Sequence, residues 1–195
     1  MNPLSIRQDK SLGIATGISI SFLALYLISS HVGILPPLES QDAIGDISGW
    51  CERISSGIFR EPINALSNLG FMLVGLLMIR ALGRDTQSSR IINQFHGLTP
   101  VSVLYSGSVL FLGAGSMLMH GTQSGFGEWA DNLSMVSYIL IPWLINVGEM
   151  GRWTSRKFFV TYTILVTSYA CVRWIIGNDL GINLNIFELS IGLWI

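Results

Sequence analysis

The sequence contains few charged residues, which make up 12% of its 195 positions, against about 25% in soluble globular domains. So little charge cannot cover an ordinary water-facing surface, and a hydrophobic content of 50% excludes an intrinsically disordered chain. The formal net charge of −1 leaves no excess of basic residues for binding nucleic acid. Two cysteines are too few for a small domain built on disulfides. The remaining class is an integral membrane protein that crosses the bilayer several times.

Long apolar segments support this class, because a helix needs about 20 apolar residues to cross the hydrocarbon core. We expect one integral membrane domain over 1–195 with six helices, at about 13–35, 63–82, 101–119, 133–147, 158–176 and 182–195. A signal peptide is the alternative for the first segment. That segment is longer than the usual apolar core of such a peptide and lacks a clear cleavage site, which favours a retained helix. The predicted fold is therefore an all-α, polytopic transmembrane helical bundle.

Lysine and arginine lie mainly on alternate connections between these segments, and such a bias sets the orientation of membrane helices. The basic connections contain Arg7 and Lys10, Arg84 and Arg90, and Arg152, Arg156 and Lys157. We therefore expect a cytoplasmic N-terminus. The loops at 36–60, 120–132 and 177–181 should then face the exoplasmic side.

The first group of polar residues surrounds the start of the second apolar segment. Glu61, Asn64 and Asn68 recur at helical spacing and would share one face. Pro62 suits the first turn of a helix, where its missing N–H costs nothing. One interpretation is a helix cap with interhelical hydrogen bonds. Alternatively, Glu52 and Glu61 together could hold a hard cation such as Ca²⁺.

The second group contains Ser116, His120 and Asp131. Ser116 and His120 are four residues apart on one helical face, and a short hairpin brings Asp131 back to the same side of the membrane. A core histidine whose ring N–H is satisfied by Asp131 is the structural alternative.

Three chemistries fit this second group. A Ser-His-Asp triad is disfavoured because Ser116 would point alongside His120 rather than at it. A proton relay in a transporter is disfavoured because no inverted repeat is visible. A zinc site with His120 as ligand, Asp131 handling protons and Ser116 orienting a water or an oxyanion is the preferred interpretation.

These motifs resemble the alkaline ceramidase family, within a wider superfamily of seven-helix membrane hydrolases. The form Arg60-Glu61-Pro62-Ile63-Asn64-x-x-Ser67-Asn68 looks closest to bacterial members, which carry an extra leading helix like the segment at 13–35. The matching pieces are Trp50-Cys51-Glu52, Glu61-x-x-Asn64-x-x-Ser67-Asn68, Gly113-x-Gly115-Ser116-x-x-x-His120, and Asp131 followed by Ser134-Met135.

The resemblance implies a membrane-embedded, zinc-dependent hydrolase of linear amides. In that family, zinc-activated water attacks the amide of ceramide and releases a sphingoid base and a fatty acid. By this likeness His120 is a zinc ligand, Ser116 a supporting hydroxyl and Asp131 a proton-handling carboxylate. The lipid amide would enter sideways from the bilayer.

The resemblance also implies a calcium site and a disulfide. Glu52 and Glu61 match acidic ligands that hold Ca²⁺ in animal members, whereas Gly49 and Ile54 stand where the family has an acid and an amide. A bond between Cys51 and Cys171 is conceivable in an oxidising compartment.

One part of the family pattern is missing. The family completes its zinc site with a His-x-x-x-His pair on the last helix, but the histidines of this chain are His31, His96 and His120. With the short segment at 182–195, this favours a truncated seven-helix design over a diverged pseudoenzyme. The alternative function is a non-catalytic lipid-binding or receptor-like membrane protein.

Overall fold

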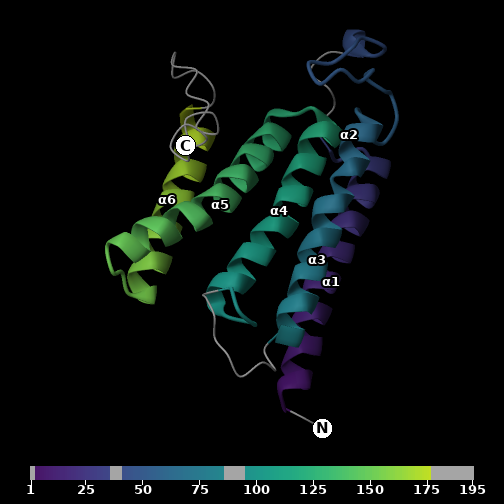
Figure 1. Ribbon diagram of the computed structural model, residues 1–195. Coiled ribbons are helices and arrows are strands. Elements are labelled where there is room, and N and C mark those ends of the chain that lie inside the picture. Colours follow the sequence, from purple (N-terminus) through teal and green to yellow (C-terminus); the bar gives the residue numbers. More distant parts are fainter. Residues whose placement is uncertain (1–2, 36–40, 86–94, 177–195) are drawn as a thin grey trace.

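The structure, a computed structural model, describes residues 3–35, 41–85 and 95–176. These residues form a bundle of α-helices with one short 3₁₀ helix, η1 (Gln41–Ala43), in a loop (Figure 1). The predicted all-α class is confirmed. The helices are α1 (Pro3–His31), α2 (Pro62–Ser67), α3 (Leu69–Asp85), α4 (Pro100–Thr122), α5 (Gly125–Met150) and α6 (Ser155–Ile176).

Five helical segments among the described residues are long and apolar enough to cross a membrane, rather than the six expected. Short α2 and α3 together supply one of them. The predicted helix at 182–195 lies outside the described residues. The five segments are Lys10–His31, Pro62–Asp85, Pro100–Thr122, Gly125–Met150 and Ser155–Ile175.

The turn between α4 and α5 determines which side chains meet. Gln123 ends α4 in a left-handed conformation (φ 48°), and the hydroxyl of Ser124 then caps α5 by accepting a hydrogen bond from the amide of Gly127. Helix α5 therefore starts at Gly125, eight residues before the start at residue 133 that the sequence predicted. Asp131 lies in the second turn of α5, not at its start, and His120 lies in the last turn of α4.

Small residues allow α4 to pack closely against its neighbours. A Cβ atom on Gly113 would lie 2.7 Å from the backbone oxygen of Asn68, and one on Gly115 would lie 2.6 Å from that of Ala130. Such close approach of backbones is the usual way in which membrane helices associate. It makes α4 the central helix, in contact with α1, α2, α3 and α5.

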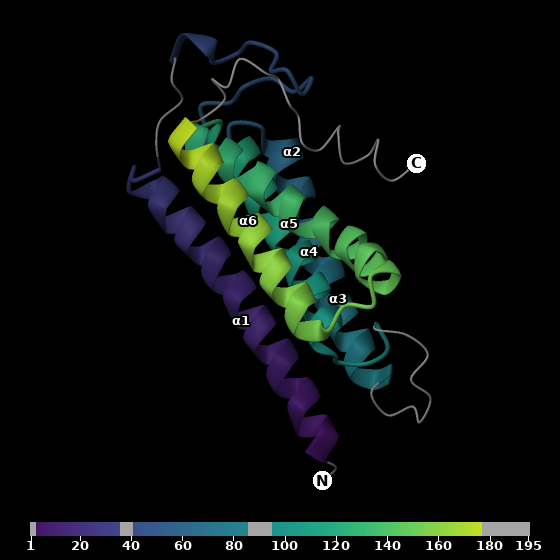
Figure 2. The same cartoon turned by 90° about the vertical axis from the view of Figure 1, so that its left-hand side faces the viewer.

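The two ends of the bundle differ in character. Both views place α2 and the 41–60 loop beside the end of α4 at one end, and the α5–α6 connection at the other (Figures 1 and 2). We call these the outer end and the inner end. At the inner end an apolar cluster joins α5 and α6 through the buried side chains of Ile141, Leu144, Phe158 and Tyr162. Among the described helices, α6 packs against α5 alone.

Candidate functional site

Main-chain hydrogen bonds hold the outer-end loop against the last turn of α4. The amide of Arg60 donates to the carbonyl of Gly121 (3.0 Å), and the amide of Glu61 donates to the carbonyl of His120 (2.9 Å). These bonds satisfy two carbonyls that a helix end leaves without partners. They also bring the side chains of Glu61 and His120 together across 59 residues of sequence.

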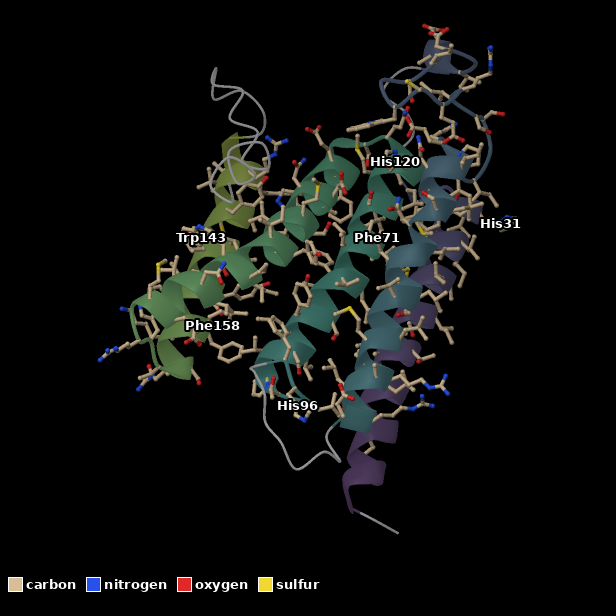
Figure 3. The ribbon with its side chains drawn as sticks, in the orientation of Figure 1. His31, Phe71, His96, His120, Trp143 and Phe158 are labelled. Carbon is tan, nitrogen blue, oxygen red and sulfur yellow. The ribbon has the colours of Figure 1, made fainter. Side chains whose placement is uncertain are left out.

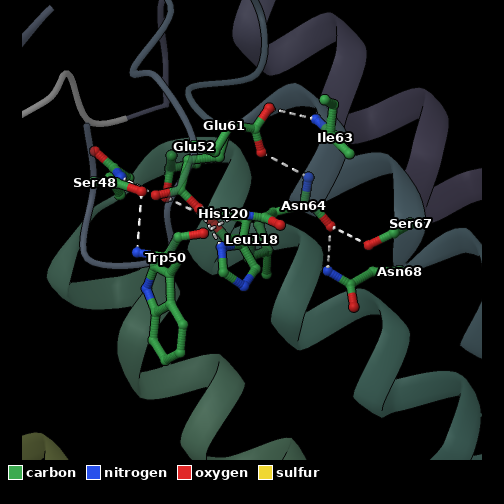
Figure 4. Close-up of polar contacts among 12 residues, drawn as sticks. Ser48, Trp50, Glu52, Glu61, Ile63, Asn64, Ser67, Asn68, Leu118 and His120 are labelled. Carbon is green, nitrogen blue, oxygen red and sulfur yellow. Dashed lines mark hydrogen bonds and ion pairs between the residues drawn. The ribbon is translucent and has the colours of Figure 1, made fainter. Parts of the chain in front are cut away.

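Glu61 is the centre of the polar cluster (Figure 4). Its carboxylate is fully buried, and its Oε2 lies 2.5 Å from Nδ1 of His120. The side-chain amide of Asn64 donates to the same oxygen at 3.1 Å, and the side-chain amide of Gln123 donates to Oε1. A buried charge needs such partners because it has lost its hydration.

The partners of Glu61 also fix its charge state. Burial alone would raise the pKa of Glu61, but hydrogen bonds from Ser48, His120 and Asn64, with the charge of His120, hold that pKa below its ordinary value. Glu61 is therefore an ionised carboxylate at neutral pH.

The carboxylate of Glu61 orients the ring of His120. When Nδ1–H donates to Glu61, Nε2 is the ring nitrogen that remains for a metal ion. A carboxylate on the second nitrogen is the usual companion of a metal-ligating histidine, since it fixes the ring and raises its basicity. The edge of Trp50 packs on the ring at 5.5 Å between centroids.

Asp131 pairs with Ser116 instead of with His120. The Asp131 carboxylate lies close enough to the Ser116 hydroxyl and to His120 to interact with both. In the structural alternative considered from the sequence, Asp131 satisfied the histidine ring. Glu61 does so instead, because the bonds of residues 60–61 to the end of α4 place it beside Nδ1.

Glu52 has a different role from Glu61. Its two carboxylate oxygens accept hydrogen bonds from the backbone amides of Ile63 (2.7 Å) and Asn64 (2.8 Å), in the first turn of α2. A negative charge is favourable at a helix N-terminus, so Glu52 acts as a distant cap.

These contacts do not fit a calcium site. Calcium takes six to eight oxygen ligands, yet the carboxylates of Glu52 and Glu61 already accept hydrogen bonds from groups of the chain. Gly49 offers no side-chain oxygen, and Ile54 is a buried apolar residue. We therefore derive no role for calcium.

The fit to zinc is partial. His120 supplies one oriented imidazole, and catalytic zinc usually has three protein ligands. The other histidines lie elsewhere: His31 ends α1, and His96 precedes α4 near the inner end (Figure 3). Within the described part of the chain, no group of three His, Cys, Asp or Glu residues is placed to hold a metal ion.

The expected disulfide is not formed in the structure. Cys51 and Cys171 are both free and exposed. Cys51 lies in the loop before α2, whereas Cys171 lies on α6, which contacts α5 and not the helices beside that loop.

Sequence reasoning missed Gln123 and the pairing of Glu61 with His120. The signal for Gln123 was weak, because a polar residue between two apolar segments is ordinary for a turn. The pairing depends on a backbone contact between distant segments, which no local pattern encodes.

Comparison with known proteins gives one informative match. No solved structure matches the chain significantly. Over 163 residues the chain is 24% identical to Pleiotropic drug resistance protein 1 of Nicotiana tabacum, an alignment that covers 80% of this chain and 11% of that protein. A likeness to so small a part of a long protein carries no functional argument. The profile described as Ceramidase matches residues 47–194, which include both motif groups and most of the chain, so the protein belongs to the ceramidase family.

Proposed function

We propose that this integral membrane protein hydrolyses the amide bond of ceramide or of a similar lipid amide, using zinc. The single observation that carries the proposal is the pairing of His120 with a buried carboxylate beside the Ser116–Asp131 pair. These two pairs lie at one end of a membrane-spanning helix in a chain of the ceramidase family.

Each residue of the two pairs has a distinct part. His120 would bind zinc through Nε2, and Glu61 would hold the ring in the correct tautomer. When bound, the metal supplies Lewis-acid activation of water and of the amide carbonyl. Asp131 would accept a proton and return it to the leaving amine, which is general acid–base catalysis. The hydroxyl of Ser116 would donate its one proton to the oxygen on which charge develops.

The position of the site suits a lipid amide. Ser116 and His120 lie near the end of an apolar helix, so hydrocarbon chains could remain in the bilayer while the amide reaches the polar residues. The basic connections of the sequence favour the exoplasmic side for this end. The substrate would then arrive laterally from the membrane.

One observation favours the alternative, a non-catalytic lipid-binding or receptor-like protein. The described residues bring one imidazole to the site, and Glu52 and Glu61 are both engaged by the chain itself. Such a cluster could serve only to hold the loop against α4.

Metal content and hydrolysis distinguish the two functions. We expect the purified protein to bind zinc, measured by elemental mass spectrometry, and to release fatty acid from a fluorescent ceramide in detergent micelles. His120→Ala and Asp131→Ala should each lower the rate by about 100-fold or more, because general acid–base and metal catalysis each contribute at least that much. Ser116→Ala should have a smaller effect.

Two control substitutions match these variants. His31→Ala removes an exposed histidine at the end of α1, and Ser108→Ala removes a hydroxyl two turns away on α4 that bonds only the carbonyl of Tyr105. Both should keep the parental rate. If His120→Ala and Asp131→Ala hydrolyse as well as the parent, the site assignment is wrong. A zinc-free, inactive parent that still binds ceramide would support the receptor-like function.

A further inference from the structure

An apolar cavity of about 610 Å³ lies between α1, α3 and α4. Its α4 wall includes Gly107, Ala114 and Leu118, which recur at helical spacing on one face. Ser116 is two residues from both Ala114 and Leu118, hence about 200° around the helix. This wall is therefore on the far side of α4 from the Ser116–His120 face, and Ser116 and His120 do not line the cavity, although Gly115 beside Ser116 does.

Small side chains create this cavity. Ser11, Ala15 and Ser19 follow at four-residue intervals on the face of α1 that lines it. Opposite them, a Cβ atom built on Gly107 would meet no atom within 4 Å. The hydroxyl of Ser19 donates to the carbonyl of Ala15 (2.9 Å), so it adds little polarity to the wall.

Beyond the lining of the cavity, towards the outer end, α1 is fixed to the loop before α2. Tyr26 is buried, stacks on Phe59 at 5.1 Å between ring centroids, and donates its hydroxyl to the carbonyl of Ile58 (3.0 Å). The same ring packs against Gly121 of α4. The lining residues Ile14 and Ile18 are exposed, so a lipid chain can enter the cavity from its side. The inner end of the cavity lies at Ser11, Ile79 and Val103.

Basic residues adjoin the lining residues of that inner end in the sequence. Lys10 precedes Ser11 on α1, Arg80 follows Ile79 on α3, and Arg84 is one turn further; all three are exposed. Asp85, the last residue of α3, is the acidic neighbour. By the basic-residue bias of the sequence this end faces the cytoplasm, where the leaflet carries anionic lipids.

We propose that this cavity binds one hydrocarbon chain of an anionic phospholipid, with its phosphate at Lys10, Arg80 and Arg84. The part of the membrane that surrounds the cavity is hydrocarbon, so an acyl chain is the ligand at hand. The volume of about 610 Å³ lies within the range of about 300–1,000 Å³ typical of ligand pockets. The stretch of α4 from Val103 to Leu118 rises about 22 Å at 1.5 Å per residue. One leaflet makes up half of a hydrocarbon core of about 30 Å, so this stretch of α4 is longer than one leaflet is thick. A lipid chain therefore fits along the cavity.

Photolabelling tests the site directly. The probe is phosphatidylglycerol with a diazirine in one acyl chain, reconstituted with the full chain in nanodiscs, and phosphatidylcholine with the same labelled chain is the comparison. We expect the phosphatidylglycerol label on α1 and α4 peptides that line the cavity, found by mass spectrometry of the unmodified protein. Label spread over the lipid-facing surfaces of α5 and α6 instead, or equal labelling of the cavity by both lipids, would overturn the proposal.

Two variants sharpen the test. Gly107→Leu fills the cavity, and labelling there should fall about tenfold, which corresponds to a loss of about 1.4 kcal/mol. Gly17→Leu is the matched control, since Gly17 is exposed on α1, outside the cavity lining, and also has no atom within 4 Å of a built Cβ. The double variant Arg80→Gln/Arg84→Gln should reduce phosphatidylglycerol labelling to the phosphatidylcholine level. Parental labelling in Gly107→Leu would contradict the site, whether or not the protein hydrolyses ceramide.

Discussion

The outer and inner ends of the bundle are held together by opposite kinds of interaction. At the outer end, the buried carboxylate of Glu61 is stabilised by hydrogen bonds from His120, Asn64 and Gln123. At the inner end, buried apolar side chains of α5 and α6 pack against each other without a charge among them. Polar clusters specify one geometry, whereas apolar clusters tolerate adjustment. The difference suggests that the chemistry depends on the outer end and much of the stability on the inner end.

The largest effect on stability is expected at the inner end. Leu144 is fully buried in the apolar cluster, and Leu144→Ala should lower the free energy of unfolding by about 2–5 kcal/mol through lost contacts and a new cavity. Thermal unfolding in detergent would measure this loss. Hydrolysis per folded molecule should stay at the parental level if the two ends are separable.

The control for this change is Leu73→Ala, since Leu73 is 57% exposed on α3 and truncation there should cost little. A large fall in specific activity in Leu144→Ala would show that packing at the inner end reaches the site.

A smaller but more informative effect is expected where α4 and α5 cross. In Gly115→Ala the new methyl group would lie 2.6 Å from the carbonyl oxygen of Ala130, so the helices must separate. Overpacking of this kind costs about 1–3 kcal/mol. Because Ser116 and Asp131 are the next residues on the two helices, hydrolysis should fall together with stability.

Gly70→Ala provides the comparison for that variant, because a Cβ on Gly70 meets nothing within 4 Å. It should leave the melting temperature and the rate unchanged. Parental activity in a destabilised Gly115→Ala would separate the helix crossing from the chemistry.

The smallest effect concerns the cap on α2. Glu52→Gln keeps the shape of the side chain but removes the charge that meets two backbone amides, so stability should fall by about 0.5–2 kcal/mol. The melting temperature of the parent should be the same in calcium and in a chelator. A calcium-induced rise that Glu52→Gln abolishes would contradict the capping role and restore the calcium site.

Patterns within single segments predicted a large part of the fold. Apolar length indicated the membrane helices, and the short hairpin placed His120 and Asp131 at the same end of the bundle. The start of α5 was misplaced because 125–132 contains two glycines and three polar or charged residues, which read as a loop. In the structure the cap by Ser124 and the contact of Gly127 with α4 make this stretch helical.

The partners within the site could not be predicted in the same way. Glu61 looked like a calcium ligand because it and Glu52 are carboxylates that match acidic ligands of the family. Its bond to His120 depends on how the 41–60 loop crosses the end of α4, and that crossing is set by contacts between residues far apart in sequence. The absence of a bond between Cys51 and Cys171 also depends on long-range contacts. Among the described helices α6, which carries Cys171, packs only on α5, so Cys171 is not brought to the loop that carries Cys51.

Two hydrogen bonds between peptide groups join residues 60–61 to residues 120–121. Most replacements of Arg60 would therefore leave both bonds available and keep His120 in place at the end of α4, whereas a side chain on Gly121 would collide with Tyr26. Proline at residue 60 is the exception, because it has no amide hydrogen to donate. The main chain, rather than the surrounding side chains, therefore sets where the His120 imidazole lies along the bundle.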